Sequence, residues 1–210
     1  MAEPTQEREV TVYWDLENCA VPRDGDCATF CQGLRRLAQR FGEVVTIVAY
    51  LGTVDGKLPQ FPSSREQRKW QALKDYGVRI KCIKRSGRRE DADRAMISES
   101  PRYSFKNGQP LTASLPADMI LSMEDAPCNK TAILVSGDRD FTLPVSACTA
   151  KGMSVVLIAD ERALGRLGHL SQAVRLFAWP VDVVEAARNP VGPASVPHQY
   201  PFKPLFYSFD

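Results

Sequence analysis

The sequence has little that would place the protein in a membrane or send it out of the cell. No apolar run approaches the roughly 20 residues that a membrane-spanning helix needs. The N-terminus, Met-Ala-Glu-Pro-Thr-Gln-Glu-Arg-Glu, lacks the basic and then apolar pattern of a secretory signal. We therefore expect an intracellular and most simply cytoplasmic protein that does not contact membranes.

Several common ligand-binding motifs are also missing. The six cysteines form no Cys-x-x-Cys pair and the chain has only two histidines, so we expect free thiols rather than a structural zinc site. No Gly-x-Gly-x-x-Gly follows the first predicted strand, and no P-loop motif is present. These absences disfavour dinucleotide binding and P-loop nucleotide chemistry.

The charged residues show no excess of one sign. The chain has 27 Lys and Arg against 25 Asp and Glu, which gives a net charge of +2 and does not by itself identify a nucleic-acid-binding protein. The distribution is more informative, because residues 79–89 contain six basic side chains and no acidic one. Such a segment could bind the phosphates of a nucleic acid without reading its sequence.

Short apolar runs alternate with helical patterns along the chain. The predicted strands are 10–14, 44–50, 78–83, 131–136, 154–159 and 174–178, and the predicted helices are 26–40, 64–76, 90–99, 117–125 and 142–151. Asp26, Ser64 and Thr142 are the predicted N-caps of their helices, and residues 52–62 read as a loop. A strand that reads as a continuous apolar run is typical of a parallel sheet covered on both faces. The pattern predicts an α/β fold with three layers, α/β/α, around a mostly parallel sheet of five or six strands.

The chain is predicted to hold one domain with extensions. Residues 1–8 read as an N-terminal extension, 9–188 as the domain, and 100–115, with their proline and glycine, as an insertion loop. Residues 189–210 form a tail rich in proline and aromatic residues. We expect this tail to be extended and to pack on the domain, on a second copy of the chain or on a partner protein.

Acidic residues follow two of the predicted strands directly. Asp15 comes after the strand 10–14, and Asp138 and Asp140 come just after the strand 131–136. Open α/β sheets bind their ligands beyond the carboxyl ends of the strands. Carboxylates that converge there repel one another unless a cation lies between them, so the pattern indicates a Mg²⁺ or Mn²⁺ site.

Three motifs in this order resemble those of a known family. They are Trp14-Asp15-Leu16-Glu17-Asn18, then Ala92-Asp93-Arg94-Ala95 with Ala117-Asp118-Met119, then Ser136-Gly137-Asp138-Arg139-Asp140-Phe141. The chain resembles NYN domains, a branch of the PIN-like nuclease superfamily, and above all the limkain-type domain of meiosis regulator and mRNA stability factor proteins. The resemblance implies a PIN-like, Rossmann-like fold and a metal-dependent endoribonuclease that acts on single-stranded RNA, in RNA turnover or the regulation of gene expression.

The resemblance also implies roles for individual residues. The catalytic and metal-binding carboxylates would be Asp15, Asp118, Asp138 and Asp140, with Asp93 at the rim of the metal site and Glu99 as the alternative to Asp118. The residues expected to contact RNA or to orient the carboxylates are Asn18, Ser136, Thr142, Lys84, Arg85, Arg88 and Arg139. Taken alone, Asp140 or Asp93 reads more simply as a helix cap or turn residue.

Two other functions remain open from the sequence. The central carboxylates Asp93 and Asp118 lie farther apart than the family pattern has them, which favours a catalytically inactive RNA-binding module as the alternative. A phosphatase of the haloacid dehalogenase kind would use Asp15 as a nucleophile. That chemistry calls for a second aspartate two positions later, where this chain has Glu17.

Overall fold

The computed structural model describes residues 8–53, 57–58, 63–84, 127–167 and 174–189. The strands are β1 (Glu9–Asp15), β2 (Glu43–Thr53), β3 (Val78–Lys84), β4 (Lys130–Val135), β5 (Ser154–Ala159) and β6 (Val174–Ala178). The helices are α1 (Cys27–Gln39), α2 (Ser64–Asp75), α5 (Thr142–Ala150), α6 (Glu161–Leu167) and α7 (Val181–Arg188), with 3-10 turns η1 (Pro127–Asn129) and η2 (Arg139–Phe141).

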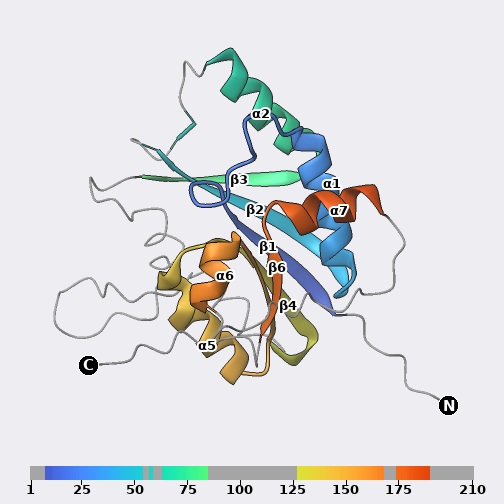
Figure 1. The fold of residues 1–210 in the computed structure, drawn as a ribbon, viewed down its shortest axis with the longest axis vertical. Coiled ribbons are helices and arrows are strands. Elements are labelled where there is room, and N and C mark those ends of the chain that lie inside the picture. The colour runs from blue at the N-terminus through green and yellow to red at the C-terminus, as the bar shows by residue number, and fades with distance from the viewer. Residues whose placement is uncertain (1–7, 54–56, 59–62, 85–126, 168–173, 190–210) are drawn as a thin grey trace, which may run out of the picture.

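The six strands form one sheet in the order β3-β2-β1-β4-β5-β6, and every pair is parallel (Figure 1). From β1 the chain builds the sheet outward through β2 and β3. It then returns to the middle, and β4, β5 and β6 extend the sheet in the opposite direction. The strand order therefore reverses between β1 and β4, which is the point where sheets of this kind hold ligands beyond their carboxyl ends.

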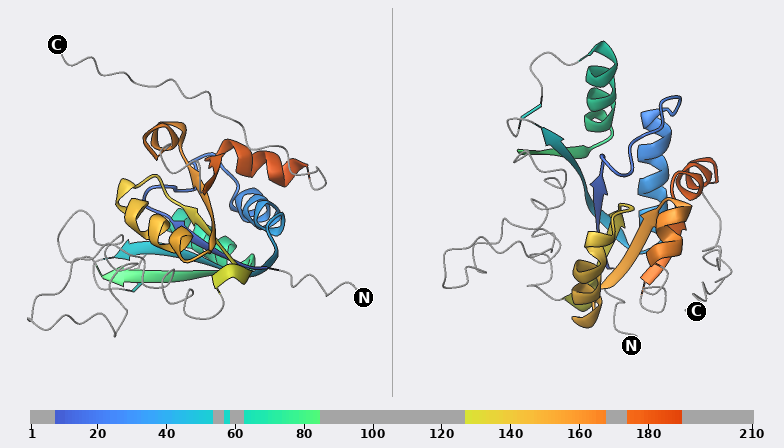
Figure 2. Two further views of the ribbon diagram at one scale, coloured as in Figure 1. Left: turned by 90° about the horizontal axis from the view of Figure 1, so that it is seen from below. Right: turned by 60° about the vertical axis from the view of Figure 1, so that its left-hand side comes forward.

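Helices cover both faces of the sheet (Figure 2). One core lies between the sheet and α1, α2 and α7, and a second core lies between the sheet and α5 and α6. The prediction of a three-layer α/β fold with a mostly parallel sheet is confirmed. Among the residues that the structure describes, no helix is both long enough and apolar enough to cross a membrane.

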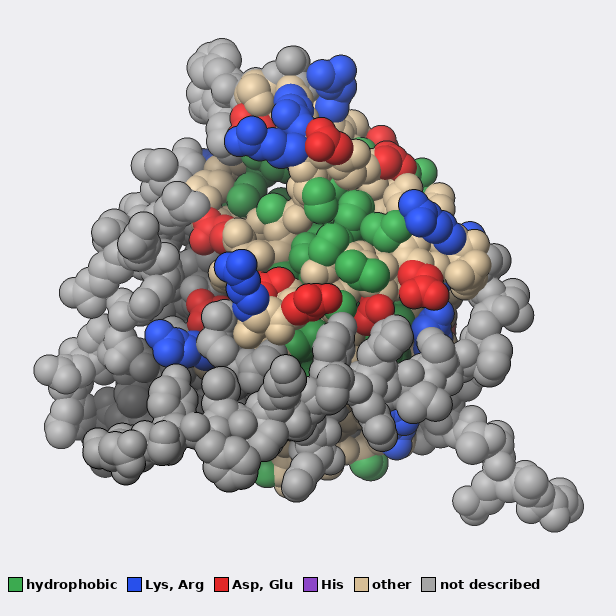
Figure 3. Space-filling model, in the orientation of Figure 1, with side chains coloured by type: hydrophobic (Ala, Val, Ile, Leu, Met, Phe, Trp, Pro, Cys, Tyr) green, Lys and Arg blue, Asp and Glu red, His purple; other side chains and the backbone are tan. Residues whose placement is uncertain are grey.

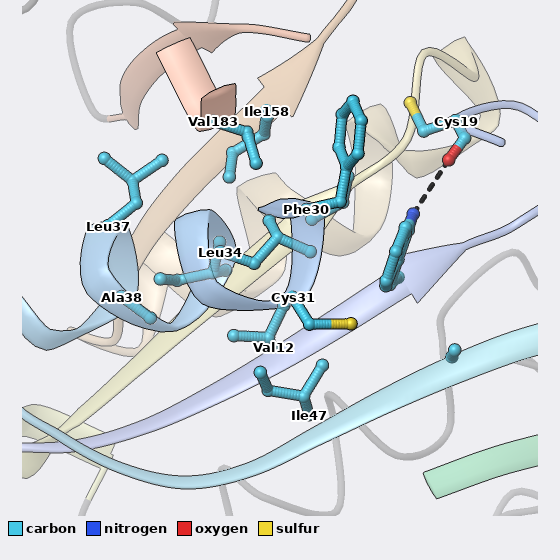
Figure 4. Close-up of a cluster of buried hydrophobic side chains, with 14 of the residues drawn as sticks. Val12, Cys19, Phe30, Cys31, Leu34, Leu37, Ala38, Ile47, Ile158 and Val183 are labelled. Carbon is cyan, nitrogen blue, oxygen red and sulfur yellow. Dashed lines mark hydrogen bonds between the residues drawn. The ribbon is translucent and has the colours of Figure 1, made fainter. Parts of the chain in front are cut away.

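The packing of α1 explains why its sequence forms a helix at this place. The carboxylate of Asp26 accepts hydrogen bonds from the backbone N–H groups of Ala28 and Thr29, so the predicted N-cap is confirmed. Phe30 and Leu34, four residues apart, are buried and point from α1 into the core that Figure 4 shows. The helix is therefore fixed on the sheet from its first turn onward.

The structure corrects several details of the predicted elements. All six strands are found, although β2 continues to Thr53, where a loop over 52–62 was predicted. The N-cap of α2 is Ser63, which forms a capping box with Glu66, so the predicted cap at Ser64 is wrong by one residue. The short helices α6 and α7 were not predicted. The predicted helices 90–99 and 117–125, the insertion loop 100–115 and residues 190–210 of the tail lie outside the described residues.

Candidate functional site

Asp15 is the last residue of β1, and its side chain is fully buried. Oδ1 accepts hydrogen bonds from the backbone N–H groups of Glu17 (2.9 Å) and Asn18 (3.1 Å). Oδ2 accepts from the Asn18 side-chain amide (2.6 Å) and from the Ser136 hydroxyl (2.9 Å). A carboxylate offers about four acceptor positions, so all of them are used by donors of the protein.

Ser136 connects the ends of three neighbouring strands. Its hydroxyl donates to Asp15 at the end of β1 and accepts from the backbone N–H of Asp138, at 3.2 Å. The backbone N–H of Ser136, directly after β4, donates to the carbonyl oxygen of Ile158 in β5, at 3.1 Å. The fully buried serine therefore joins the Asp15 carboxylate to the backbone of Asp138, although the two residues come from distant parts of the sequence.

A third carboxylate lies at the same edge of the sheet. Asp160 directly follows β5, and its Oδ1 accepts a hydrogen bond from the backbone N–H of Ala163 at 2.9 Å, inside the first turn of α6. A Cβ atom added to Gly137 would lie only 3.1 Å from Asp160 Oδ2. Asp160 was not predicted as a site residue, although an aspartate after the apolar run 154–159 repeats the pattern of the other two strand ends.

The pKa of the Cys19 thiol is affected by the carboxylates at this edge of the sheet. Burial raises its pKa to about 12, and the negative charges of Asp15 and Asp160 add to this increase, while a hydrogen bond with the Gly137 backbone acts against it. One buried thiol is thus influenced by the carboxylates that follow β1 and β5. We refer to Asp15, Ser136, Asp138 and Asp160 as the carboxylate site.

Most of the cysteines should be inert while the protein is folded. Burial raises the pKa of Cys31 to about 12 and that of Cys148 to about 11, as it does for Cys19, and only Cys128 is exposed. Because the thiolate is the reactive form, iodoacetamide at pH 8 should label Cys128 first and spare these three. Peptide mass spectrometry of native and urea-unfolded samples measures this, and early labelling of Cys19 would contradict the burial of the site.

The other predicted site residues in the described part of the chain occupy different positions. Asn18 is exposed beside Asp15, and Arg139 is exposed in η2. The predicted cap at Thr142 is wrong, because Phe141 holds the N-cap position of α5 without a side-chain hydrogen bond. Thr142 is the first residue of that helix, and its hydroxyl donates to the Arg139 carbonyl oxygen at 2.6 Å.

The remaining predicted residues are not described with their side chains. For Asp140, in η2, and Lys84, at the end of β3, the structure describes the backbone but not the side chain. The residues outside the described part of the chain altogether are Asp93, Glu99, Asp118, Arg85 and Arg88. Two basic residues of the segment 79–89 are visible on β3. Arg79 donates to the Thr46 hydroxyl (3.1 Å), and the Lys81 ammonium lies 5.9 Å from the centre of the Tyr50 ring.

The donor chemistry of the carboxylate site suits a hard cation. Within the described ranges, no group of three or more His, Cys, Asp or Glu side chains is close enough to hold a metal ion. Mg²⁺ keeps several of its waters and is commonly held by one or two carboxylates, so the aspartates that follow β1, β4 and β5 are donors of a suitable kind. Soft ligands play no part, because the buried Cys19 thiol stays protonated at neutral pH.

Comparisons with known proteins support this fold and identify the family of the chain. The crystal structure of a protein of unknown function from Vibrio parahaemolyticus is similar over 86% of this chain and 98% of that chain, with a TM-score of 0.55 and 19% sequence identity, which supports the fold. No curated protein matches the chain. The family model of the NYN domain matches residues 9–173, from the first residue of β1 to the residue before β6. The chain therefore belongs to the NYN domain family, within the PIN-like nuclease superfamily.

Proposed function

We propose that the protein is a metal-dependent endoribonuclease that hydrolyses internal phosphodiester bonds of single-stranded RNA. The observation that carries this proposal is the Ser136 hydroxyl, which joins the buried Asp15 carboxylate to the backbone of Asp138 at the point where the strand order reverses. Membership of the NYN family supports nuclease chemistry. The motifs that begin at Trp14 and Ser136 support the limkain-type branch as the finer assignment.

The buried and the accessible carboxylates have different tasks in this proposal. Asp15 holds the loop that follows β1, because its four acceptor positions are filled by that loop and by Ser136. The side-chain amide of Asn18 is the donor that can leave, since it belongs to an exposed residue. Once it leaves Asp15, this amide is available to the scissile phosphate.

Asp138 and Asp160 are the carboxylates through which the protein would hold Mg²⁺ or Mn²⁺, together with Asp15. When bound, such an ion neutralises charge on the phosphate and lowers the pKa of a water that attacks it. Asp118 and Asp140 complete the acidic set in this proposal, with Asp93 at its rim and Glu99 as the alternative to Asp118. Arg139, exposed between Asp138 and Asp140, would contact a neighbouring phosphate.

A cleavage assay tests the proposal. We would incubate end-labelled single-stranded RNA with the protein in Mn²⁺, Mg²⁺ or EDTA, beside the variants Asp138→Asn and Glu43→Gln. Glu43 is an exposed carboxylate at the opposite edge of the sheet, so its variant removes an equal charge away from the site. We expect cleavage that requires the metal, is lowered by about a hundredfold or more in Asp138→Asn and is retained in Glu43→Gln.

The assay can also reject the proposal. Cleavage that continues in EDTA, or that Asp138→Asn and wild type share, would remove the carboxylate site from the chemistry. RNA binding without cleavage in any metal would favour the inactive RNA-binding module instead. A labelled aspartyl-phosphate on Asp15 would indicate a phosphatase.

A further inference from the structure

Basic side chains gather at one end of α2, on the side of the molecule where the carboxylate site lies. Because β2 and β3 are parallel, the helix between them runs back along the sheet. Its first residues therefore lie at the edge where the strands end, the same edge as Asp15. Arg65 and Arg68 are exposed in this first part of α2, and Arg23 is exposed in the loop after β1. Figure 3 shows Lys and Arg side chains, with Asp and Glu side chains beside them, at the top of the view, where α2 lies.

Two contacts fix this part of α2 to the loop of the carboxylate site. The Arg65 guanidinium donates to the carbonyl oxygen of Arg23, and the Lys69 ammonium donates to that of Val21 at 3.3 Å. The same loop begins at Asp15, whose carbonyl oxygen accepts from the Cys19 N–H at 2.9 Å. Arg23 thus belongs to the loop that starts at the site, and Arg65 and Lys69 are hydrogen-bonded to that loop from α2. These basic residues therefore keep a fixed position relative to the site.

Two nearby acidic side chains, Glu66 and Asp26, are turned toward the helix starts, while Asp24 is exposed next to Arg23. Glu66 forms the capping box of α2 with Ser63, and these hydrogen bonds lower the pKa of its carboxyl group. Asp26 caps α1, and its bonds to Thr29 lower its pKa in the same way. Both carboxylates are held at the helix starts by donors of the protein and stay negatively charged. In the first half of α2 the three basic side chains, Arg65, Arg68 and Lys69, still outnumber the single acidic one, Glu66.

The charge along α2 is unevenly distributed. Its first half holds Arg65, Arg68 and Lys69 with Glu66, whereas its last turns hold one basic residue, Lys74, next to Asp75. A charged helix is commonly only a solvated face. Here the excess of basic residues is confined to the first half of α2, which contacts the loop after β1. The basic residues therefore lie at the same edge of the sheet as the carboxylate site.

We propose that Arg23, Arg65 and Arg68, which we call the arginine ridge, bind the phosphate backbone of the RNA strand as it leaves the carboxylate site. The inference rests on the proposed function for the identity of the ligand. Arginine suits this task because its planar guanidinium binds phosphate oxygens in pairs and stays charged. A site made of carboxylates repels the RNA backbone, and cations next to it offset that repulsion.

Binding measured without metal tests the ridge separately from the chemistry. Fluorescence anisotropy of a short, unpaired, labelled RNA is recorded in EDTA over a series of salt concentrations, with wild type, Arg65→Glu, Arg65→Gln and Lys74→Glu. Lys74 is the matched control, because it lies on the same helix about 14 Å farther along. That distance exceeds the screening length of about 8 Å at physiological salt.

We expect Arg65→Glu to raise the dissociation constant for RNA by about tenfold and to lower the slope of log K against log salt by about 0.7. Arg65→Gln should lie between this variant and wild type, and Lys74→Glu should bind as wild type does. Circular dichroism shows whether each variant keeps its helices. An acidic residue in the first turn suits the helix dipole, so Arg65→Glu should fold.

The outcomes separate this inference from the proposed function. If wild type binds RNA through the ridge but never cleaves it, the inference stands and the proposed function fails. If wild type cleaves RNA while Arg65→Glu binds as well as wild type, or Lys74→Glu weakens binding to the same extent, the inference is overturned. If wild type binds no RNA but binds an acidic protein or an anionic vesicle, both are overturned.

Discussion

Asp15→Asn should destabilise the fold as well as stop RNA cleavage, whereas Asp138→Asn should affect cleavage alone. Asp15 is fully buried and accepts four hydrogen bonds, two of them from backbone N–H groups that cannot change direction. An asparagine keeps one oxygen for those two donors and must point its NH₂ group at Ser136. The hydroxyl then loses its acceptor, in a place that water does not reach.

The expected loss is about 2 kcal/mol in the free energy of unfolding, because a buried donor left without its partner costs about 1–3 kcal/mol. For a chain of this size that corresponds to a melting temperature lower by about 4–8 °C. Thermal unfolding followed by circular dichroism measures it, beside the cleavage assay. Asp138 is only half-buried, so its variant is the control for stability. An Asp15→Asn protein that melts with wild type would show that the four bonds do not hold the loop.

Gly33→Ala should be among the most destabilising single changes in the described part of the chain. In most helices this change stabilises by about 1 kcal/mol, because alanine is the better helix former. Here the new Cβ atom would lie 2.0 Å from the carbonyl oxygen of Val183 in α7, where no side chain fits. The helix cannot move aside, since Phe30, Leu34 and Leu37 fix α1 in the core (Figure 4).

We expect Gly33→Ala to lower the free energy of unfolding by about 3 kcal/mol or more. Helix propensity alone would predict the opposite, a more stable protein. Urea unfolding measures the difference. Gln32→Ala is the matched control, because Gln32 is the exposed neighbour on the same helix and its change should stay within about 0.5 kcal/mol. Equal stability of the two variants would mean that α1 and α7 do not approach as closely as described.

The sequence predicted the parts of this protein whose signals are local. Most of the strands contain a run of apolar residues, and β3 alternates apolar and basic residues. Both patterns can be read without knowing which strands are neighbours. Asp26 is recognisable as a cap because it precedes a helical pattern. Asp15 and Asp138 stood out because each follows a buried strand and belongs to a family motif.

The features that were missed depend on which strands are neighbours. Asp160 joins the candidate site because β5 lies beside β4, which brings it against Gly137. The arginine ridge exists because α2 starts at the edge where β1 ends. From the sequence, Gly33 is only a poor helix former inside a predicted helix. Its contact with Val183 shows that the close approach of α1 and α7 requires a glycine at this position. The cap of α5 was predicted one position too late, at Thr142, because Phe141, which occupies the N-cap position, is a poor capping residue by type.

The central position of β1 and β4 also bears on how the protein is made. The bond between Ser136 and Asp15 joins residues 121 positions apart, so a ribosome must synthesise most of the domain before the two can meet. Pairing of such distant strands is slow compared with local folding. During translation the segment from β1 to β3 carries Asp15 and the arginine ridge without the second half of the site. The carboxylate site can therefore be complete only after β4 and β5 have joined the sheet.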